Sequence, residues 1–304
     1  GTVFIGTNEG MLHAFETVAG VERWAYVPSM VMPNMWKLAD KNYSTMHTYY
    51  VNGGPIISDI CTSSCTTASA VWRTILVGGL NGGGRGYYAL DITNPATPSL
   101  LWEFDTTSDN DLGYSFGDPV ITKKSDGTWV VLVTSGYNNT TGSNPGKGFL
   151  YVLDAVTGAK IDKIPTGVGD AITPSGLAKI ISFVDQSEKN NTATFTYGGD
   201  LLGNVWRFDI NAAAAPGTNP LLFATLKDPS GNPQPITATP ELGLINNQRV
   251  LFVGTGKYLE ASDLTNTQQQ SLYAIMDDNA STTLVNPRTT LVQQTLTTSG
   301  ASRS

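Results

Sequence analysis

The stretch FTYGGDLLGNVWRFDI, residues 195–210, contains the pattern that decides the fold. Two runs in which apolar and polar side chains alternate flank a turn containing Gly199, Asp200 and Gly203. Alternation with a period of two is typical of β-strands, and glycine adopts the positive φ that tight turns require. The stretch therefore predicts a β-hairpin, with Trp206 and Phe208 packed between neighbouring sheets.

The same hairpin pattern recurs along the chain, its first arms beginning 55 to 72 residues apart. The recurrences are VFIGTNEGMLHAFE (3–16), ILVGGLNGGGRGYYALDI (75–92), VLVTSGY to KGFLYVLDA (131–155) and VLFVGTGKYLE to QSLYAIMD (250–277). A Pro-led apolar run precedes every hairpin except the first, and a further run closes each unit. The closing runs after the first unit are SLLWEFD (99–105), AKIDKIPT (159–166), PLLFATLKD (220–228) and TTLVQQTL (289–296). Repeated four-strand units predict an all-β β-propeller of four-stranded antiparallel blades. About five blades are visible, the first with three strands, so we expect residues 1–304 to be one domain within a larger propeller.

Composition is consistent with this fold. Only 14% of the 304 residues are charged, and the chain contains 32 glycines. This balance is more typical of an extracellular all-β protein than of a helical cytosolic enzyme. The net charge of −7 argues against a nucleic-acid partner, because binding nucleic acid requires neutralisation of phosphates. No apolar run reaches the ~20 residues that a membrane-spanning helix needs.

Residues 28–53 form the largest insertion between predicted strands. Pro33 begins a short predicted helix over residues 34–40. We single out Trp36, Tyr43 and Tyr49 as candidate partner-binding residues. The alternative is that these side chains cap the apolar edges of blades.

A second insertion, residues 59–70, contains Cys61 and Cys65. Two cysteines this close in a polar loop predict a disulfide and an oxidising compartment, the alternative being two free thiols. A zinc site is disfavoured, because His13 and His47 lie far away in the sequence.

No motif for catalysis emerges from the sequence. A Ser-His-Asp triad would need His13, which lies within a strand, or His47. The glycine-rich segment 81–86 connects two strands, whereas a phosphate-binding loop leads into a helix. We therefore predict that the protein is not an enzyme.

Two acidic loops are candidate calcium sites. One contains Asp105, Asp109 and Asp111; the other contains Asp185, Glu188 and Asn190. Calcium is bound by several oxygen ligands that converge from a tight loop, often at every second residue. The alternative for the second loop is a solvated hairpin tip.

Two alternative functions come from the repeat itself. AFETVAGVERW (14–24) and LDAVTGAKI (153–161) are similar to the repeat of pyrroloquinoline-quinone dehydrogenases, which are also propellers. A quinone-dependent dehydrogenase is therefore one alternative. A periplasmic scaffold propeller that serves outer-membrane assembly is another. A shared blade pattern indicates fold rather than function.

Longer blocks carry a more specific resemblance. The blocks are GTNEGMLHAF (6–15), PNMWKLAD (33–40) with YYVNGGP (49–55), WRTILVGGLNGGGRGYYALDIT (72–93), LWEF (101–104) with DLGYSFGDP (111–119), TYGGDLLGNVWRFDI (196–210), QPITATPELG (234–243) and VGTGKYLEASD (253–263). In this order they resemble the C-terminal propeller of the PilC/PilY family of type IV pilus tip adhesins. The match extends to about residue 263.

The resemblance implies a protein exported to the bacterial cell surface and located at the pilus tip. It implies minor pilins and a host or abiotic surface receptor as partners, with roles in pilus assembly against retraction, adhesion and twitching motility. It also implies a calcium loop whose ligand positions fall at Gln186, Glu188, Asn190 and Thr194, of which only Glu188 is a carboxylate. Asp185 could substitute after a shift of one residue. The eroded loop favours no bound calcium, and no other cofactor is expected.

Overall fold

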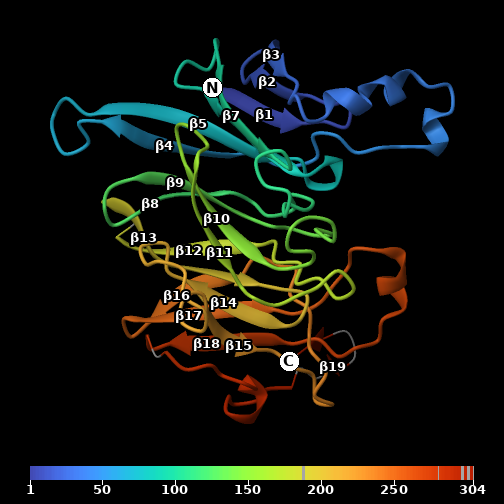
Figure 1. Ribbon diagram of the computed structural model, residues 1–304, viewed down its shortest axis with the longest axis vertical. Coiled ribbons are helices and arrows are strands. Elements are labelled where there is room, and N and C mark those ends of the chain that lie inside the picture. The colour runs from blue at the N-terminus through green and yellow to red at the C-terminus, as the bar shows by residue number, and fades with distance from the viewer. Residues whose placement is uncertain (187–188, 280, 296–297, 300–301, 304) are drawn as a thin grey trace.

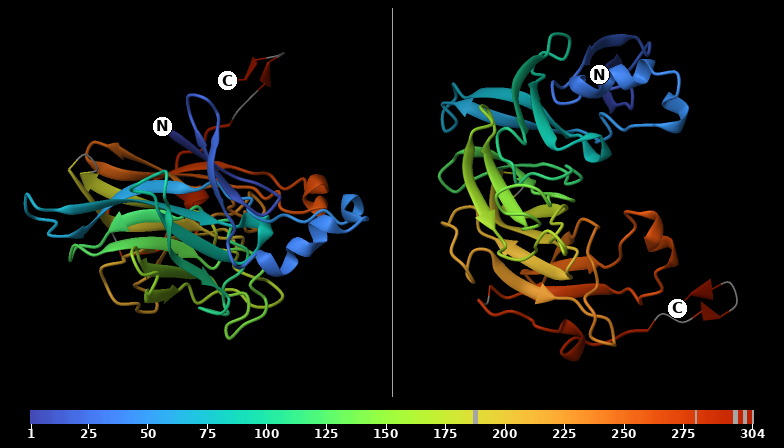
Figure 2. Two further views of the ribbon diagram at one scale, coloured as in Figure 1. Left: turned by 90° about the horizontal axis from the view of Figure 1, so that it is seen from above. Right: turned by 45° about the vertical axis from the view of Figure 1, so that its right-hand side comes forward.

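The computed structural model describes residues 1–304 except 187–188, 280, 296–297, 300–301 and 304. Its sheets form five successive blades stacked along an arc, with the chain running from one end to the other (Figures 1 and 2). The first blade has three strands, as the sequence predicts: β1 (Thr2–Gly6), β2 (Leu12–Glu16) and β3 (Glu22–Tyr26). The predicted all-β propeller is thus confirmed.

The next three blades each have four antiparallel strands. Blade 2 comprises β4 (Ile56–Ser63), β5 (Val71–Gly79), β6 (Gly86–Asp91) and β7 (Ser99–Asp105). Blade 3 comprises β8 (Val120–Lys123), β9 (Trp129–Thr134), β10 (Phe149–Asp154) and β11 (Lys160–Pro165). Blade 4 comprises β12 (Ile180–Gln186), β13 (Asn190–Gly199), β14 (Asn204–Phe208) and β15 (Leu221–Thr225). A parallel bridge between Lys123 and Thr192 joins blades 3 and 4 into one eight-stranded sheet.

Blade 5 has three strands, β16 (Glu241–Ile245), β17 (Gln248–Gly254) and β18 (Leu272–Asp277). The sequence predicts a fourth strand at residues 289–296. Residues 289–295, the described part of this range, form no strand, so the prediction is wrong there. Pro287 begins the 3₁₀ helix η5 (Pro287–Thr289), and the amides of Thr290 and Leu291 donate to the Pro287 carbonyl. These amides are therefore committed to a helical turn instead of a sheet ladder. Two short strands follow, β19 (Thr298–Ser299) and β20 (Ser302–Arg303).

Among the described residues, the 3₁₀ helices are short and lie only in connections between strands. Besides η5 they are η1 (Met32–Ala39), η2 (Tyr43–Thr45), η3 (Asn81–Gly83) and η4 (Ala261–Thr265). The first confirms a helical turn after Pro33. None of the helices among the described residues has the length and apolar character needed to cross a membrane.

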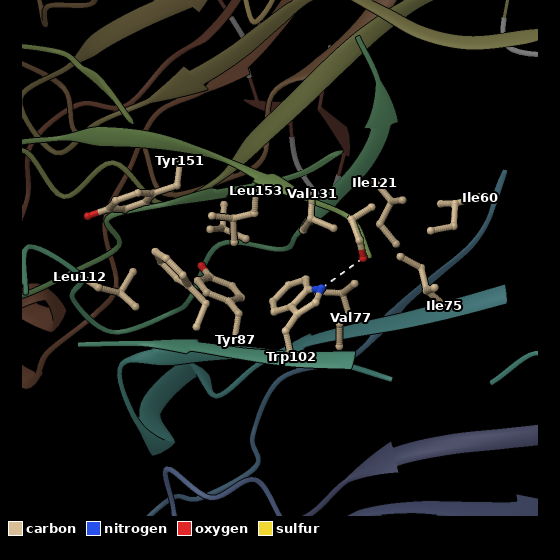
Figure 3. Packing of buried hydrophobic residues seen from close by; sticks show 14 of the residues in the cluster. Ile60, Ile75, Val77, Tyr87, Trp102, Leu112, Ile121, Val131, Tyr151 and Leu153 are labelled. Atoms are coloured by element: carbon tan, nitrogen blue, oxygen red, sulfur yellow. Dashed lines mark hydrogen bonds between the residues drawn. The ribbon is translucent and has the colours of Figure 1, made fainter. Parts of the chain in front are cut away.

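Blades pack face to face through layers of apolar side chains. Between blades 2 and 3, the Trp102 indole lies among aliphatic side chains and donates to the Ala155 carbonyl at 3.1 Å (Figure 3). Between blades 3 and 4, Trp206 and Phe208 belong to one cluster with Leu132 and Val152. The predicted packing of Trp206 and Phe208 between sheets is therefore confirmed.

The turn of the 195–210 hairpin is fixed by Asp200, whose carboxylate is fully buried. Oδ1 accepts from the amides of Leu202 and Asn204, and Oδ2 accepts from the Trp206 indole at 2.9 Å. Burial raises the pKa of Asp200, although these donors favour the charged form. The aspartate thus ties the hairpin turn to the side chain that packs against blade 3.

Candidate functional site

Most of the long connections of the propeller lie at one end of the blades. Because successive antiparallel strands reverse direction, the second-to-third-strand loop and the link to the next blade leave from the same end. Residues 27–55, 80–85, 106–119, 135–148, 166–179, 226–240 and 255–271 lie on this side, which we call the long-loop face. Residues 27–55 and 255–271 both project toward the right in Figure 1.

Backbone hydrogen bonds connect neighbouring loops on this face. The amide of Val51 donates to the Thr7 carbonyl, Ser115 to Gly84, Gly136 to Leu177, and Ile236 to Asp200, at distances of 2.8 to 3.3 Å. Each of these bonds joins a hairpin loop of one blade to the connection that leads from that blade to the next. The long-loop face is therefore a continuous scaffold, and its outer segments are carried by rigid backbone.

The 28–53 insertion is anchored to this scaffold at both ends. Val31, Tyr50 and Val51 are 0–2% exposed and pack with Leu80. The Tyr50 hydroxyl donates to the Asn34 carbonyl at 2.9 Å, which connects the end of the insertion to its helix η1. The insertion is thus held in one conformation at its base.

Gly83 makes this anchoring possible. A Cβ atom at Gly83 would lie 1.6 Å from the Tyr50 carbonyl oxygen. Gly83→Ala is therefore expected to displace the base of the insertion and lower the free energy of unfolding by about 1–3 kcal/mol. Gly54→Ala is the matched control, because a Cβ there meets nothing within 4 Å. Urea unfolding with limited proteolysis of the insertion measures the effect; equal stability and equal cleavage in the two variants would contradict it.

Beyond its base, the insertion exposes large apolar side chains. Trp36 is 64% exposed, Met32 53%, Tyr49 48% and Met46 46%. Of the three predicted partner-binding residues, Trp36 and Tyr49 are thus accessible. Tyr43 is half-buried and donates its hydroxyl to the Thr48 carbonyl at 3.2 Å.

A groove of about 560 Å³ runs between the insertion and the glycine-rich loop 81–84. Its walls include Met30, Pro33, Lys37, Gly83, Arg85 and Tyr114. The Arg85 guanidinium lies 5.5 Å from the centroid of the Tyr114 ring and donates to the Asn138 carbonyl at 2.8 Å. Sequence reasoning missed Lys37 and Arg85 as site residues, because their proximity depends on how the insertion folds back.

The acidic loop at Asp105, Asp109 and Asp111 leaves blade 2, and two of its carboxylates bind lysines of β11 in blade 3. Asp109 lies 2.6 Å from the Lys160 ammonium and 2.7 Å from that of Lys163. Lys163 also lies 2.7 Å from Asp111, whose side chain is 1% exposed. Asp105 takes no part in these ion pairs. Its carboxylate accepts hydrogen bonds from the amide and the hydroxyl of Thr107.

Burial alone would raise the pKa values of Asp109 and Asp111. Hydrogen bonds from Lys160 and Lys163 to Asp109, and from Lys163 and Asn144 to Asp111, outweigh burial and hold both pKa values below the ordinary value. Both carboxylates are thus ionised and already paired with cations of the chain. This donor set does not fit calcium. Sequence reasoning missed Lys160 and Lys163, and the available signal was two lysines in the closing strand of blade 3. They lie three residues apart, and the register of this strand shifts between them.

The second acidic loop also departs from a calcium site. Asp185 accepts from the Thr194 hydroxyl at 2.6 Å and lies 4.0 Å from the Arg249 guanidinium. The Asn190 amide oxygen accepts from Thr192. Glu188 lies outside the described residues. A guanidinium beside the nearest carboxylate disfavours a second cation, so the described residues of this loop do not fit calcium.

Addition of calcium is therefore expected to leave the melting temperature of the purified protein unchanged. A bound ion would stabilise the folded state in proportion to its occupancy. Scanning calorimetry in millimolar calcium and in EDTA measures this, with magnesium as the control. A rise in Tm specific to calcium contradicts the expectation. Within the described part of the chain, no group of three or more His, Cys, Asp or Glu residues could hold a metal ion.

Cys61 and Cys65 form a disulfide on the opposite side of the propeller. The predicted loop 59–70 is shorter in the structure, since β4 continues to Ser63 and pairs Cys61 with Trp72. Only residues 64–70 connect the strands. The disulfide closes the tip of this hairpin.

The fold and the loops together define a class: a β-propeller that carries most of its long connections on one face. Comparison with known proteins identifies the family. The model of the PilY1 β-propeller domain matches residues 1–303, so the chain belongs to this family.

Curated relatives include the type IV pilus biogenesis factor PilY1 of Pseudomonas aeruginosa strain UCBPP-PA14, which is 34% identical over 97% of this chain. A PilY1 homolog of Xylella fastidiosa strain Temecula1 is 36% identical over 96% of this chain. The chain spans 27% and 22% of these relatives, about a quarter of their length. The crystal structure of the P. aeruginosa PilY1 C-terminal domain has a TM-score of 0.73 and 31% identity, over 93% of this chain and 60% of that chain.

Proposed function

We propose that this chain is the non-enzymatic propeller of a type IV pilus biogenesis factor that acts as an adhesin at the pilus tip. In this role the protein supports pilus extension against retraction, adhesion and twitching motility. It is exported to the cell surface, where minor pilins and a host or abiotic surface receptor are its partners. The observation that carries the proposal is the match of the PilY1 propeller model to residues 1–303.

The mechanism we propose is display. Hydrogen bonds between neighbouring loops hold the long-loop face rigid, and the insertion presents Trp36 and Tyr49 on it. Rigid aromatic side chains are typical of residues that contribute most to protein interfaces. The long-loop face is thus the surface we assign to partner binding.

The environments of the two histidines support a role without catalysis. The His13 ring nitrogens lie 2.7 Å from Glu9 and 3.0 Å from Glu22, so both are occupied by carboxylates of the chain. His47 lies against the rings of Tyr43 and Tyr49. Neither arrangement resembles a histidine oriented toward a nucleophile.

The test uses full-length protein expressed in a piliated bacterium whose own gene is deleted. Replacement of residues 30–48 by a short Gly-Ser linker is expected to reduce surface pili and twitching zones severalfold while the protein is still exported. The control replaces residues 66–69 of the opposite side in the same way. Sheared-pilus yield, twitching-zone diameter and labelling of intact cells are measured. Normal motility and piliation without the insertion, or a protein shielded from the label, would contradict the proposal.

A further inference from the structure

The groove between the 28–53 insertion and the glycine-rich loop combines positive charge with exposed apolar surface. Two walls of the groove are rigid. The insertion is anchored through Tyr50, and Gly83, which has no side chain, lets the glycine-rich loop pack directly against the insertion. The volume of about 560 Å³ is in the range of sites that bind ligands of several residues or small molecules. The groove is thus formed before any partner arrives.

Cations outnumber carboxylates in the lining of this groove. The groove lining contains Lys37 and Arg85 against Asp105, and the neighbouring Glu103 already accepts from Ser29 and Tyr26, whereas the whole chain has a net charge of −7. A local excess of positive charge on an acidic protein attracts a partner of opposite charge.

Lys37 and Arg85, the two cations of the groove, differ in how far their hydrogen-bond donors are already used by the chain. Lys37 is half-buried in the last turn of η1 and has no ion pair among the described residues. Arg85 is oriented by Tyr114 and by bonds to the Asn138 carbonyl and Thr141 hydroxyl. These two bonds use a minority of the five N–H donors of a guanidinium, and the others suit a carboxylate.

Apolar side chains line the groove or lie on the same helix as Lys37. Met32 and Trp36 are exposed on η1, and Met30 and Tyr114 line the groove. Methionine adapts to different apolar shapes, while tryptophan, tyrosine and arginine are enriched in the central parts of protein interfaces. This composition favours a protein segment over a small inorganic anion.

We infer that the groove binds an extended protein segment in which carboxylates flank an apolar side chain. The carboxylates would contact Arg85 and Lys37, and the apolar side chain would pack on the methionine and tryptophan surface. This inference rests on the proposed function for its biological setting and deepens it, since it specifies the chemistry of the partner.

The test uses the purified chain and an array of twelve-residue peptides, each with an apolar pair between clusters of Asp and Glu. Matched sets replace the acids by Asn and Gln or by Lys and Arg. We expect the acidic set to bind at least about tenfold more tightly than the neutral set, because hydrogen bonds to charged groups contribute more than neutral ones. Affinity is expected to fall with added salt.

Variants then localise the binding. With a labelled peptide of the acidic set, Lys37→Gln and Arg85→Gln are each expected to weaken binding about fivefold to tenfold. Trp36→Ala weakens it without changing the salt dependence. Arg23→Gln, on β3 outside the groove, is the control and leaves Kd within about twofold. The Lys37 side chain makes no ion pair among the described residues, so its substitution reports on binding even where Arg85→Gln disturbs the loop.

Equal binding of the three peptide sets, or acidic binding unaffected by Lys37→Gln and Trp36→Ala, would overturn the inference. Binding to a glycan array or self-association of the chain without binding of acidic peptides overturns it as well. A different result would contradict the proposed function alone. If acidic peptides bind as expected but the same variants leave piliation and twitching unchanged, the groove binds acidic segments but has no role in the pilus.

Discussion

Replacement of Lys163 by methionine is expected to lower the free energy of unfolding by about 2–3 kcal/mol at pH 7. The Lys163 ammonium lies 2.7 Å from both Asp109 and Asp111. Asp111 has a side chain 1% exposed and no other cation within salt-bridge distance among the described residues. Removing Lys163 leaves the buried Asp111 carboxylate without a cation, which typically costs several kcal/mol, although the hydrogen bonds from Asn144 remain. We place the effect at the lower end, because Lys163 is 21% exposed and Asp109 keeps Lys160.

The effect of Lys163→Met should depend on pH. The pKa values of Asp109 and Asp111 are lowered in the folded protein. A carboxyl with a lowered folded pKa contributes stability above its unfolded pKa, about 3.9, and this stability is lost as the pH falls through the folded pKa. The difference between wild type and variant should therefore be largest above about pH 5 and shrink below about pH 4.

Urea unfolding at a series of pH values measures this difference. Lys41→Met is the matched control, since Lys41 is exposed and has no ion pair in the described part of the chain. The control should stay within about 0.5 kcal/mol of wild type. A destabilisation by Lys163→Met that is the same at pH 3 and pH 7 would show that lost packing, rather than charge pairing, causes it.

Asp277→Asn is expected to lower the free energy of unfolding by about 3–4 kcal/mol, the largest effect of a single substitution that we predict. Asp277 lies on β18 with its side chain 1% exposed, and accepts from the Arg207 guanidinium of β14 at 2.6 Å. The Tyr197 hydroxyl donates to its other oxygen, and the Arg249 guanidinium lies 3.9 Å away. The asparagine has the same shape but no charge, so two buried guanidinium groups lose their shared carboxylate.

These contacts also locate the expected change within the propeller. Arg207 and Tyr197 belong to blade 4, whereas Asp277 and Arg249 belong to blade 5. Burial would raise the pKa of Asp277, but bonds from Tyr197, the Asn279 amide and Arg207 outweigh it and lower that pKa. The carboxylate is thus ionised between the blades, and its neutralisation should loosen blade 5 first.

Hydrogen exchange followed by mass spectrometry measures this for the peptides of β16 to β18. Glu241→Gln is the control: it removes a carboxylate from the same blade, at an exposed position. Protection of β16 to β18 that is equal in the two variants would contradict the assignment of Asp277 as the connection between the blades. Unfolding in urea gives the magnitude.

The sequence predicts those features of the long-loop face that involve residues close together in the chain. It misses those that involve residues brought together only by folding. The insertion at residues 28–53 and the choice of Trp36 as a candidate follow from reading the chain locally, whereas the exposure of Trp36 comes from the structure. Tyr43 was selected by the same reasoning, but it bonds to Thr48 five residues away and is half-buried. Exposure of an aromatic side chain depends on its neighbours in space, which residue type alone does not specify.

The acidic loops show the limit more clearly. Asp109 and Asp111 have the alternating carboxylates of a calcium loop, and that pattern is correctly read from the sequence. Lys163, 52 residues after Asp111, occupies the position next to them. The same holds at Asp185, where Arg249 approaches from blade 5. A ligand pattern states which groups are available; only the folded chain decides which cation reaches them.

The hairpin at residues 195–210 was determined by the sequence itself. Alternation and glycines act between residues that are adjacent along the chain, so strand, turn and register follow from local chemistry: Thr196 pairs with Phe208 and Gly199 with Val205. Repetition of this unit then fixes the propeller. The tertiary structure alone decided that Arg207, within this hairpin, pairs with Asp277 seventy residues later, and that Arg85 faces the insertion. Such contacts depend on the path of the intervening chain, because electrostatic and packing energies depend on distance in space and not on separation in sequence.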